Sequence, residues 1–222
     1  MIINHTLVAK HRGKGKRTVV GIVLHDTAGS GTHNDTLYLA SPGDGRKVSV
    51  DFTVERDGSV WQLNPDLHNS WCYHAGRATR FKGLSNQAVT KGTVGIEIVQ
   101  RAKIQLSDPT YTTSQVKATA ELCSYLCKEF KLTKSDITTH QQIITDGSRS
   151  DPRKFPFGEF WSFFNMVNDD LGEPLTHIVQ AGDTLWSLSV KYQTTVESIK
   201  SLNGMESASN IIEVGQVLKV KK

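Results

Sequence analysis

The sequence has no hydrophobic run long enough to cross a membrane. A transmembrane helix needs about 20 consecutive apolar residues, and no stretch of the 222 residues comes near that length. The chain begins with MIINH, which lacks the basic and then apolar order of a secretory signal peptide. These absences predict a protein that does not span a membrane and that stays in the cytoplasm unless another factor releases it.

Cysteine is also scarce, with only Cys72, Cys123 and Cys127 in the chain. An odd number of cysteines in a chain without a signal peptide argues against a disulfide framework. Cys123 and Cys127 would share one face of a helix, but no further histidine or cysteine lies nearby to complete a metal site. We therefore predict that all three are buried, reduced thiols.

Neither sign of charge dominates strongly. The chain has 26 Lys and Arg against 22 Asp and Glu, a formal net charge of +4. This mild excess favours approach to anionic surfaces such as a cell wall and does not imply nucleic acid. The basic stretch 10–17 has no interleaved aromatic residues, so a solvated loop is favoured over a nucleic-acid site. We predict a monomer that binds no nucleic acid.

The hydrophobic pattern predicts an α/β fold, with a mixed β-sheet flanked by helices. Apolar or alternating stretches predict strands at 19–24, 48–54, 59–63 and 94–99, the first ending directly at His25. The second and third form a hairpin around the turn at 56–58. Apolar residues at three- and four-residue steps predict helices over about 34–40, 114–130, capped by Thr113 or Ser114, and 158–169. Interspersed strands and helices are typical of helices packed on a mixed sheet.

A break in this pattern predicts two domains. Residues 171–175, LGEPL, interrupt the periodicity, and we place a first domain at 1–170, a linker at 171–176 and a second domain at 177–222. The second has its own order of strand, helix, helix and strand. The composition of the break, with Gly and Pro, is typical of a linker.

Four residues suggest hydrolytic chemistry. His25 follows a buried strand, and His140 and Asp151 lie in turn-prone segments. Two imidazoles and one carboxylate are a normal ligand set for catalytic zinc, but such scattered residues are also consistent with surface histidines and a capping aspartate. Glu97 interrupts an apolar strand, so either its face is exposed to solvent or it is a general base.

Several short motifs in the first domain resemble those of a known enzyme family. Residues 18–160 resemble the zinc-dependent N-acetylmuramoyl-L-alanine amidases that share a fold with peptidoglycan recognition proteins. The resemblance implies a zinc ion held by His25, His140 and Asp151, with Glu97 as the catalytic acid and base. It also implies that Arg149 stabilises the oxyanion. Five stretches match in order: 22–28, 48–54 with 57–58, 71–76, 94–97, and 139–140 followed by 149–152.

Other positions depart from the family pattern or admit two interpretations. Arg149 stands where members usually carry a lysine, so a cation remains but its geometry differs. Asp26 and Asp51 stand where many members have histidine, so no role is carried over to them. His74 matches an element beside the substrate cleft and is predicted to bind substrate. Trp71 either forms the wall of that cleft or packs in the core.

Residues 177–220 resemble a LysM domain over nearly their whole length. The matching segments are HIVQAGDTLWSL at 177–188, SLNG at 201–204 and VGQVLKV at 214–220. The resemblance implies a small βααβ domain that binds glycans containing N-acetylglucosamine. We predict that Trp186, which lies inside the first helix of this domain, packs in the core rather than forming a platform for a sugar. The implied groove is formed by Gly182, Asp183, Thr184, Leu185, Asn210, Ile211 and Ile212.

Together these features predict a zinc-dependent enzyme that cleaves the amide bond between N-acetylmuramic acid and L-alanine in bacterial peptidoglycan. The missing signal peptide further favours a phage or prophage endolysin, which is released by a partner that permeabilises the membrane. Two alternatives stay open. One is a cytosolic amidase that recycles soluble muropeptides, and the other is a non-catalytic peptidoglycan-binding protein.

Overall fold

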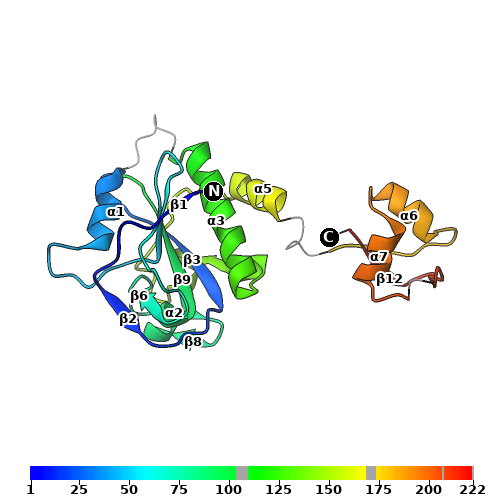
Figure 1. Cartoon of the computed structure of the whole chain (residues 1–222), viewed down its shortest axis with the longest axis horizontal. Helices are drawn as coiled ribbons and strands as arrows, with labels where there is room; N and C mark the ends of the chain where they lie inside the picture. Colours follow the sequence, from blue (N-terminus) through cyan, green and yellow to red (C-terminus); the bar gives the residue numbers. More distant parts are fainter. Residues whose placement is uncertain (104–109, 169–173, 207, 222) are drawn as a thin grey trace. The chain divides into compact units, whose positions relative to one another are not determined.

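The structure is a computed structural model, and it describes residues 1–103, 110–168, 174–206 and 208–221. It divides into two compact units, Met1–Val167 and Asn168–Lys222 (Figure 1). Residue 169 of the predicted third helix and residues 171–173 of the predicted linker lie outside the described residues. Within the described part of the chain, no helix is both long and apolar enough to cross a membrane.

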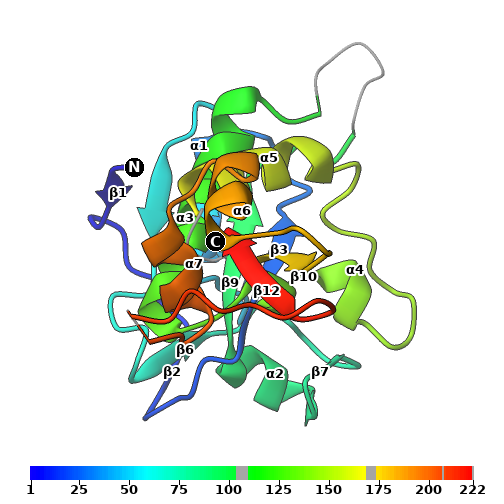
Figure 2. The same ribbon diagram turned by 90° about the vertical axis from the view of Figure 1, so that its right-hand side faces the viewer.

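The first unit is built on a six-stranded mixed sheet in the order β1-β5-β4-β9-β3-β10. The predicted hairpin is present, because β4 and β5 pair antiparallel, while the other neighbours run parallel. In Figure 2, β10 and the short α4 lie toward one edge and β1 at the other. The strands are β1 (Ile3–Asn4), β3 (Gly21–Asp26), β4 (Phe52–Val54), β5 (Val60–Gln62), β9 (Thr93–Ile98) and β10 (Ile137–Thr139).

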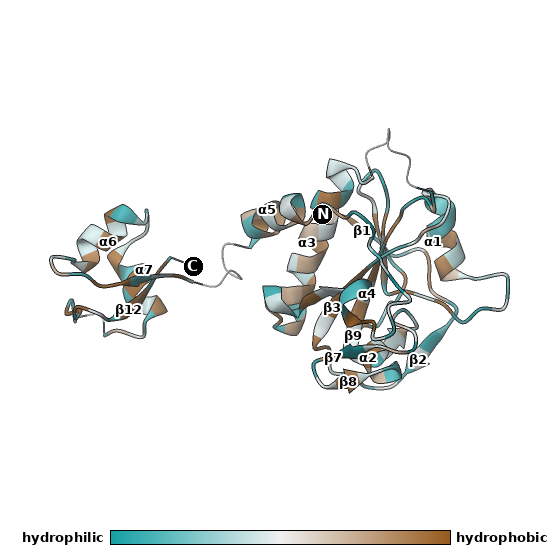
Figure 3. Ribbon diagram, turned by 180° about the vertical axis from the view of Figure 1, so that it is seen from behind, coloured by the Kyte–Doolittle hydropathy of each residue, from teal (hydrophilic) through white to brown (hydrophobic). Residues whose placement is uncertain are grey.

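The central strands β3 and β9 are buried along almost their whole length, as expected for parallel strands covered by helices. Figure 3 shows this part of the sheet in brown between helices whose outer faces are paler or teal. Four short strands form two small ladders beside the main sheet. They are β2 (Arg12–Lys14) with β6 (Ser70–Cys72), and β7 (Arg80–Phe81) with β8 (Leu84–Ser85).

Helices cover the sheet, which confirms the predicted fold class. In Figure 1, α3 and α5 lie on one side of the sheet and α1 on the other. The cap of α3 is Thr112 rather than the predicted Thr113 or Ser114, because the Thr112 hydroxyl accepts from the Gln115 backbone N–H at 3.1 Å. The helices are α1 (His33–Ala40), α2 (Gln87–Gly92), α3 (Thr113–Phe130), the 3₁₀ turn η1 (Lys134–Asp136), α4 (His140–Ile143) and α5 (Phe157–Val167).

The three cysteines are buried and free, as predicted. Cys123 and Cys127 lie one turn apart on the buried face of α3. Cys72 ends β6 and packs with Val50, Leu63 and other apolar side chains. The thiols therefore serve as small apolar groups in the core.

The second unit has the predicted βααβ order, with β11 (Leu175–Ile178), α6 (Leu185–Lys191), α7 (Val196–Leu202) and β12 (Val217–Lys221). Strand β11 begins inside the segment predicted to be linker and pairs antiparallel with β12. The core contains Leu185 and Leu188. Our placement of Trp186 in that core was wrong, since its side chain is 71% exposed. One residue turns a helix by about 100°, so Trp186 points away from the face that Leu185 and Leu188 bury.

Candidate metal centre and catalytic cavity

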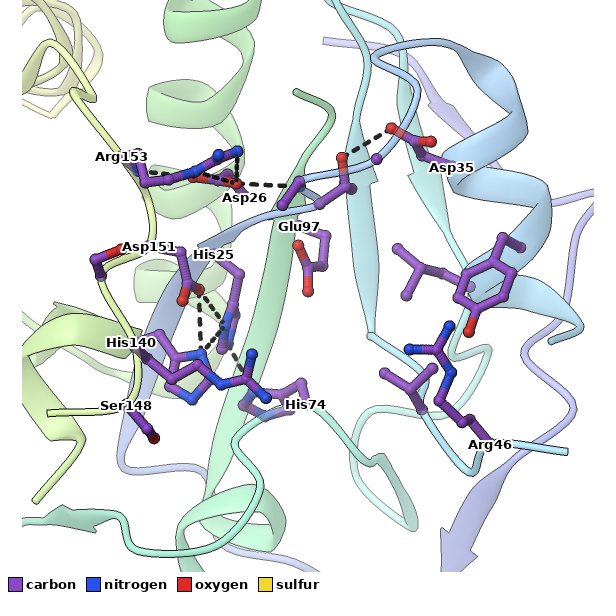
Figure 4. A pocket seen from close by; sticks show the side chains of 18 residues that line it. His25, Asp26, Asp35, Arg46, His74, Glu97, His140, Ser148, Asp151 and Arg153 are labelled. Carbon is purple, nitrogen blue, oxygen red and sulfur yellow. Dashed lines mark hydrogen bonds and ion pairs between the residues drawn. The ribbon is translucent and has the colours of Figure 1, made fainter. Parts of the chain in front are cut away.

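The site lies where parallel strands end. The predicted strand ended before His25, whereas β3 continues through His25 and Asp26. Its parallel pairing with β9 places His25 directly opposite Glu97, and their side chains turn toward the same cavity (Figure 4). Ligand sites in open α/β sheets commonly form at the carboxyl ends of strands. The register of β3 and β9 therefore brings together two residues that are distant in sequence.

His140 and Asp151 arrive at the same place from outside the strands. His140 is the first residue of α4, which follows β10 directly and is capped by Thr139 and Gln142 in a capping box. The loop that carries Asp151 is tied to this helix, because the backbone N–H of Gln141 donates to the Asp151 carbonyl at 3.0 Å. The start of α4 thus positions both side chains.

The three side chains converge on one point. His25 Nδ1, His140 Nδ1 and Asp151 Oδ2 form a triangle whose sides are each 3.1 Å (Figure 4). Within the described ranges, these three residues are the cluster of histidine and carboxylate groups close enough to hold a metal ion. The sequence-based ligand set is therefore assembled in space.

The hydrogen bonds around His140 leave its inner nitrogen free for a cation. His140 Nε2 lies 3.1 Å from the Ala75 carbonyl, which can only accept. The proton therefore belongs on Nε2, and Nδ1 presents a lone pair toward the lone pairs of Asp151 Oδ2. Such groups 3.1 Å apart repel each other unless a positive charge lies between them.

Glu97 lies in the wall of this centre and is only partly exposed to solvent. Its Oε2 is buried and has no hydrogen-bond partner among the described residues. Burial raises the pKa of Glu97 well above its usual value, the nearby Asp151 raises it further, and Arg149 opposes the shift. A buried carboxyl group that is ready to hold a proton is suited to acid–base chemistry.

A cavity of about 630 Å³ opens in front of these residues. Arg149, Tyr38 and Arg46 are among its lining residues, and the Arg46 guanidinium lies 5.4 Å from the Tyr38 ring centre. Trp71 is absent from the lining: its ring packs over Gly13 and beneath the Lys91 ammonium, 5.1 Å from the ring centre. Of the two interpretations of Trp71, the structure shows packing.

His74 borders the cavity but is almost buried, with 7% of its surface exposed. Both ring nitrogens already face protein atoms: Nδ1 lies 3.1 Å from His25 Nε2, and Nε2 lies 3.2 Å from the Thr93 carbonyl. Burial, aided by the neighbouring His25, lowers the pKa of His74 well below its usual value, and burial also lowers that of His25. The two imidazoles are therefore neutral at neutral pH.

Sequence reasoning missed an ion pair that fixes the Asp151 loop. Arg153 donates to the Asp26 carboxylate from its side chain at 2.6–3.1 Å and from its backbone N–H at 2.7 Å. The Ala28 N–H also donates to Asp26. This Asp26–Arg153 pair joins the end of β3 to the residue two beyond Asp151, so it fixes one ligand segment relative to the other.

Asp51, whose role the sequence left open, is structural. Its carboxylate is fully buried, lies 3.4 Å from an Arg17 nitrogen, and accepts from Asn64 and from the Gly95 backbone N–H at 2.6 and 2.9 Å. The bond to Gly95 joins Asp51 to β9 two residues before Glu97. Asp51 therefore supports the strand rather than lining the cavity.

The predicted glycan-binding residues of the second unit are differently placed. Gly182, Thr184, Asn210 and Ile211 are exposed, whereas Leu185 is 3% exposed and belongs to the core. The Asp183 carboxylate accepts from His177 Nε2 at 2.7 Å and from the Gln180 backbone N–H, and Ile212 packs against the core. Leu185 is thus left with its backbone alone to offer a ligand.

Comparison with known proteins places these observations in context. Residues 15–154 match the family described as N-acetylmuramoyl-L-alanine amidase, and residues 177–221 match the LysM domain family. The chain is 29% identical over 219 residues to N-acetylmuramoyl-L-alanine amidase XlyA of Bacillus subtilis (strain 168). That alignment covers 96% of this chain and 64% of XlyA, so the chain spans less than two thirds of this relative.

The other similarities cover smaller parts of the chain. A stretch of 45 residues is 53% identical to N-acetylmuramoyl-L-alanine amidase sle1 of Staphylococcus haemolyticus (strain JCSC1435), covering 20% of this chain and 13% of that protein. A solved AmpD structure shares the fold with a TM-score of 0.58 and 18% identity, covering 72% of this chain and 93% of that one. The solved structure of the catalytic domain of XlyA shares the fold with a TM-score of 0.53 and 19% identity, covering 74% of this chain and 99% of that one.

Proposed function

Since this chain belongs to the N-acetylmuramoyl-L-alanine amidase family, we propose that its first unit hydrolyses the amide bond between N-acetylmuramic acid and L-alanine in bacterial peptidoglycan. One observation carries the proposal: two imidazole nitrogens and a carboxylate oxygen converge within 3.1 Å of one another beside Glu97, whose buried Oε2 has no hydrogen-bond partner among the described residues. A cation site and a proton-transfer group therefore face one cavity.

The donor set fits zinc. Zinc in catalytic sites takes three protein ligands, with histidine and carboxylate among the common choices. Tetrahedral zinc with bonds of about 2.0–2.1 Å separates its ligand atoms by about 3.3–3.4 Å, close to the 3.1 Å sides of the triangle. His25, His140 and Asp151 would hold the ion. A bound zinc ion supplies Lewis acidity, which makes water more acidic and polarises a carbonyl.

Glu97 moves the proton in the proposed reaction. It takes a proton from the attacking water and later gives it to the nitrogen of the leaving L-alanine, whose amide bond breaks. Its buried position favours this shuttle, because burial makes the protonated form stable enough to persist between the two transfers. The pKa of Glu97 would fall when a cation binds nearby, since positive charge favours the carboxylate.

Arg149 is the residue proposed to stabilise the negative charge that develops on the carbonyl oxygen. It lines the same cavity as the ligands, and its positive charge acts on Glu97. A guanidinium offers several donors in a fixed plane, whereas a lysine offers one compact charge. We propose that Arg149 donates to the oxyanion in place of the family's usual lysine.

The second unit is proposed to hold the enzyme on its insoluble substrate. Its match to the LysM family supports binding to the glycan strands of peptidoglycan. The exposed segments around Gly182 and Asn210 are the proposed contacts, with Asp183, Thr184 and Leu185 beside the first and Ile211 and Ile212 beside the second. The endolysin role and the monomeric state stay predictions.

The decisive experiment identifies the bond that is cut. Purified sacculi are digested with the full chain, and the products are analysed by mass spectrometry for new L-alanine N-termini and new reducing sugar ends. We expect free L-alanine N-termini without new reducing ends. New reducing ends would indicate a glycosidase, and no release of either kind would favour a non-catalytic peptidoglycan-binding protein.

A further inference from the structure

We propose that His74 is a positioning residue that fixes the tautomer and ring orientation of the metal ligand His25. The proposal rests on the metal site proposed above and assigns His74 a task other than contact with substrate. Figure 4 shows the His74 ring on the side of His25 that faces away from Asp151, joined to His25 by a dashed line.

The surroundings of His74 decide where its proton lies. Nε2 is 3.2 Å from the Thr93 carbonyl and 3.3 Å from the Thr93 hydroxyl. The carbonyl can only accept, and the hydroxyl proton already points to the Val89 carbonyl at 2.7 Å. Both Thr93 atoms therefore accept from His74, so Nε2 carries the proton. A neutral imidazole protonated on Nε2 has a lone pair on Nδ1.

That lone pair determines the tautomer of His25. His74 Nδ1 lies 3.1 Å from His25 Nε2, so His25 must donate its own Nε2 proton across this contact. His25 Nδ1 is then unprotonated, and it points at His140 Nδ1 and Asp151 Oδ2, each 3.1 Å away. Thr93 thus fixes the proton on His74 Nε2, and His74 in turn fixes the proton on His25 Nε2. The metal-facing Nδ1 of His25 is left unprotonated as a result.

The fold also prevents the His74 ring from moving. The ring lies against the backbone of β9, where a Cβ at position 95 would overlap it. Glycine at that position is therefore required by the ring rather than by the backbone, since Gly95 is not among the residues with positive φ. His74 in turn fixes the plane of His25 from the side, with the two rings nearly perpendicular at 79°.

This arrangement predicts an effect on metal binding. Partners of a metal-ligating histidine fix its tautomer and raise its basicity, and losing one typically lowers metal affinity by about 10–100-fold. Both His74 nitrogens are engaged by the protein, so neither is left to bind a sugar or peptide. The relevant readout is therefore zinc affinity, which a residue that merely contacts substrate would not alter.

Two substitutions test the proposal in the full chain. His74→Phe keeps a flat ring against Gly95 but removes the acceptor for His25. His74→Gln restores one donor and one acceptor in a single amide group. Zinc affinity is measured by competition with a chelator at neutral pH. His33→Phe is the matched control, because His33 contacts Glu55 and Trp61 away from the cavity.

We expect His74→Phe to weaken zinc binding by about 10–100-fold, His74→Gln to weaken it less, and His33→Phe to leave it unchanged. Thermal unfolding of the zinc-free variants shows whether each folds. Wild-type affinity in a folded His74→Phe chain would overturn the proposal.

A spectroscopic test needs no variant. In the wild-type chain labelled with ¹⁵N-histidine, nuclear magnetic resonance distinguishes protonated from unprotonated ring nitrogens. We expect the proton on Nε2 in both His74 and His25. A proton on His74 Nδ1 would overturn the proposal even if the phenylalanine variant failed to fold. A chain that binds zinc in this way but leaves sacculi intact would contradict the proposed function and not this inference.

Discussion

The two units assemble their sites in contrasting ways. In the first, the ligand atoms of His25 and Asp151 meet across 126 positions of sequence. In the second, the partners are close neighbours: His177 contacts Asp183 six positions later, and Thr184 caps α6 through Ser187. The chemistry of the first unit therefore depends on the register of a whole sheet, while the segment around Gly182 in the second is held by contacts between residues a few positions apart.

This contrast is consistent with how the two units resemble other proteins. One stretch of 45 residues matches a relative at 53% identity, while 219 residues of the chain match XlyA at 29%. Contacts between residues close in sequence restrict the residue types within one continuous segment, so similarity is expected along that whole segment. A site assembled from distant strands restricts the residue types only in the short segments that carry its side chains, so less similarity is expected between those segments. The following predictions test whether catalysis depends on the first unit and wall binding on the second.

Metal removal should abolish the activity proposed for the first unit and leave the binding proposed for the second unit intact. Chelation should abolish hydrolysis of sacculi, because His25, His140 and Asp151 would then hold no Lewis acid, while binding of the chain to sacculi persists through the second unit. Turbidity of a sacculus suspension reports hydrolysis, and co-sedimentation reports binding. Added zinc should restore lysis, and full lysis by a verified metal-free preparation would remove the metal from the mechanism.

Glu97→Gln should lower hydrolysis by about 10²–10⁴-fold, the usual contribution of a general acid–base group. Gln keeps the size of the side chain but accepts no proton, so zinc affinity and sacculus binding should stay near wild type. Release of L-alanine N-termini measures the rate. Activity within a few-fold of wild type would exclude Glu97 as the proton carrier.

Removal of residues 174–222 should weaken sacculus binding by about 10²-fold, because two linked binding sites raise the effective concentration of each other. The bond-breaking step should not change, since the metal ligands and Glu97 all lie in the first unit. The shortened chain should match the full chain on a small soluble muropeptide and fall behind on intact wall. An equal loss on both substrates would mean that the second unit supports the catalytic fold.

Asp26→Asn should destabilise the first unit by about 2–3 kcal/mol, less than for a fully buried pair because the Arg153 side chain is 26% exposed. The loop with Asp151 should loosen, and zinc affinity should fall with it. Asp44→Asn is the control, because it removes an exposed ion pair with Arg46. Urea unfolding measures both variants, and equal midpoints would show that the Asp26–Arg153 pair does not hold the loop.

The smallest expected effect is a loss of stability of the second unit in acid. Hydrogen bonds from His177 and the Gln180 backbone lower the pKa of Asp183. A lowered folded-state pKa contributes stability above the ordinary value, near pH 4, which is lost as the pH falls through the folded-state value. Asp183→Asn should flatten this dependence in the thermal unfolding of the second unit between about pH 5 and 2. An unchanged slope would assign the acid sensitivity to other groups.

The sequence predicted the elements with strong periodicity. The apolar runs of β3 and β9, the regular stripe of α3 and the strand–helix–helix–strand order of the second unit all appear in the structure. Strands of two or three residues, such as β7 and β8, were missed because so short a segment shows no period. Trp186 was misplaced because an aromatic residue between buried leucines was taken to share their face.

The site was predictable to the extent that its residues occur in motifs. His25, Glu97, His140 and Asp151 were found in this way, and the structure brings them together. The Asp26–Arg153 pair was missed because its members are 127 positions apart and an ion pair leaves no periodic signal. The tautomer chain from Thr93 through His74 was also out of reach, because it depends on which atom of each ring faces which partner.

The sealed position of the three cysteines bears on the chemical durability of this protein. Thiols react with oxidants and alkylating reagents as thiolates. Burial raises the pKa of Cys72 and Cys123 well above the usual range and that of Cys127 to about 12. The folded chain therefore presents almost no reactive thiol to an aerated medium. It can be stored and assayed without a reducing agent, and sensitivity to a thiol reagent would report unfolding rather than a damaged catalytic group.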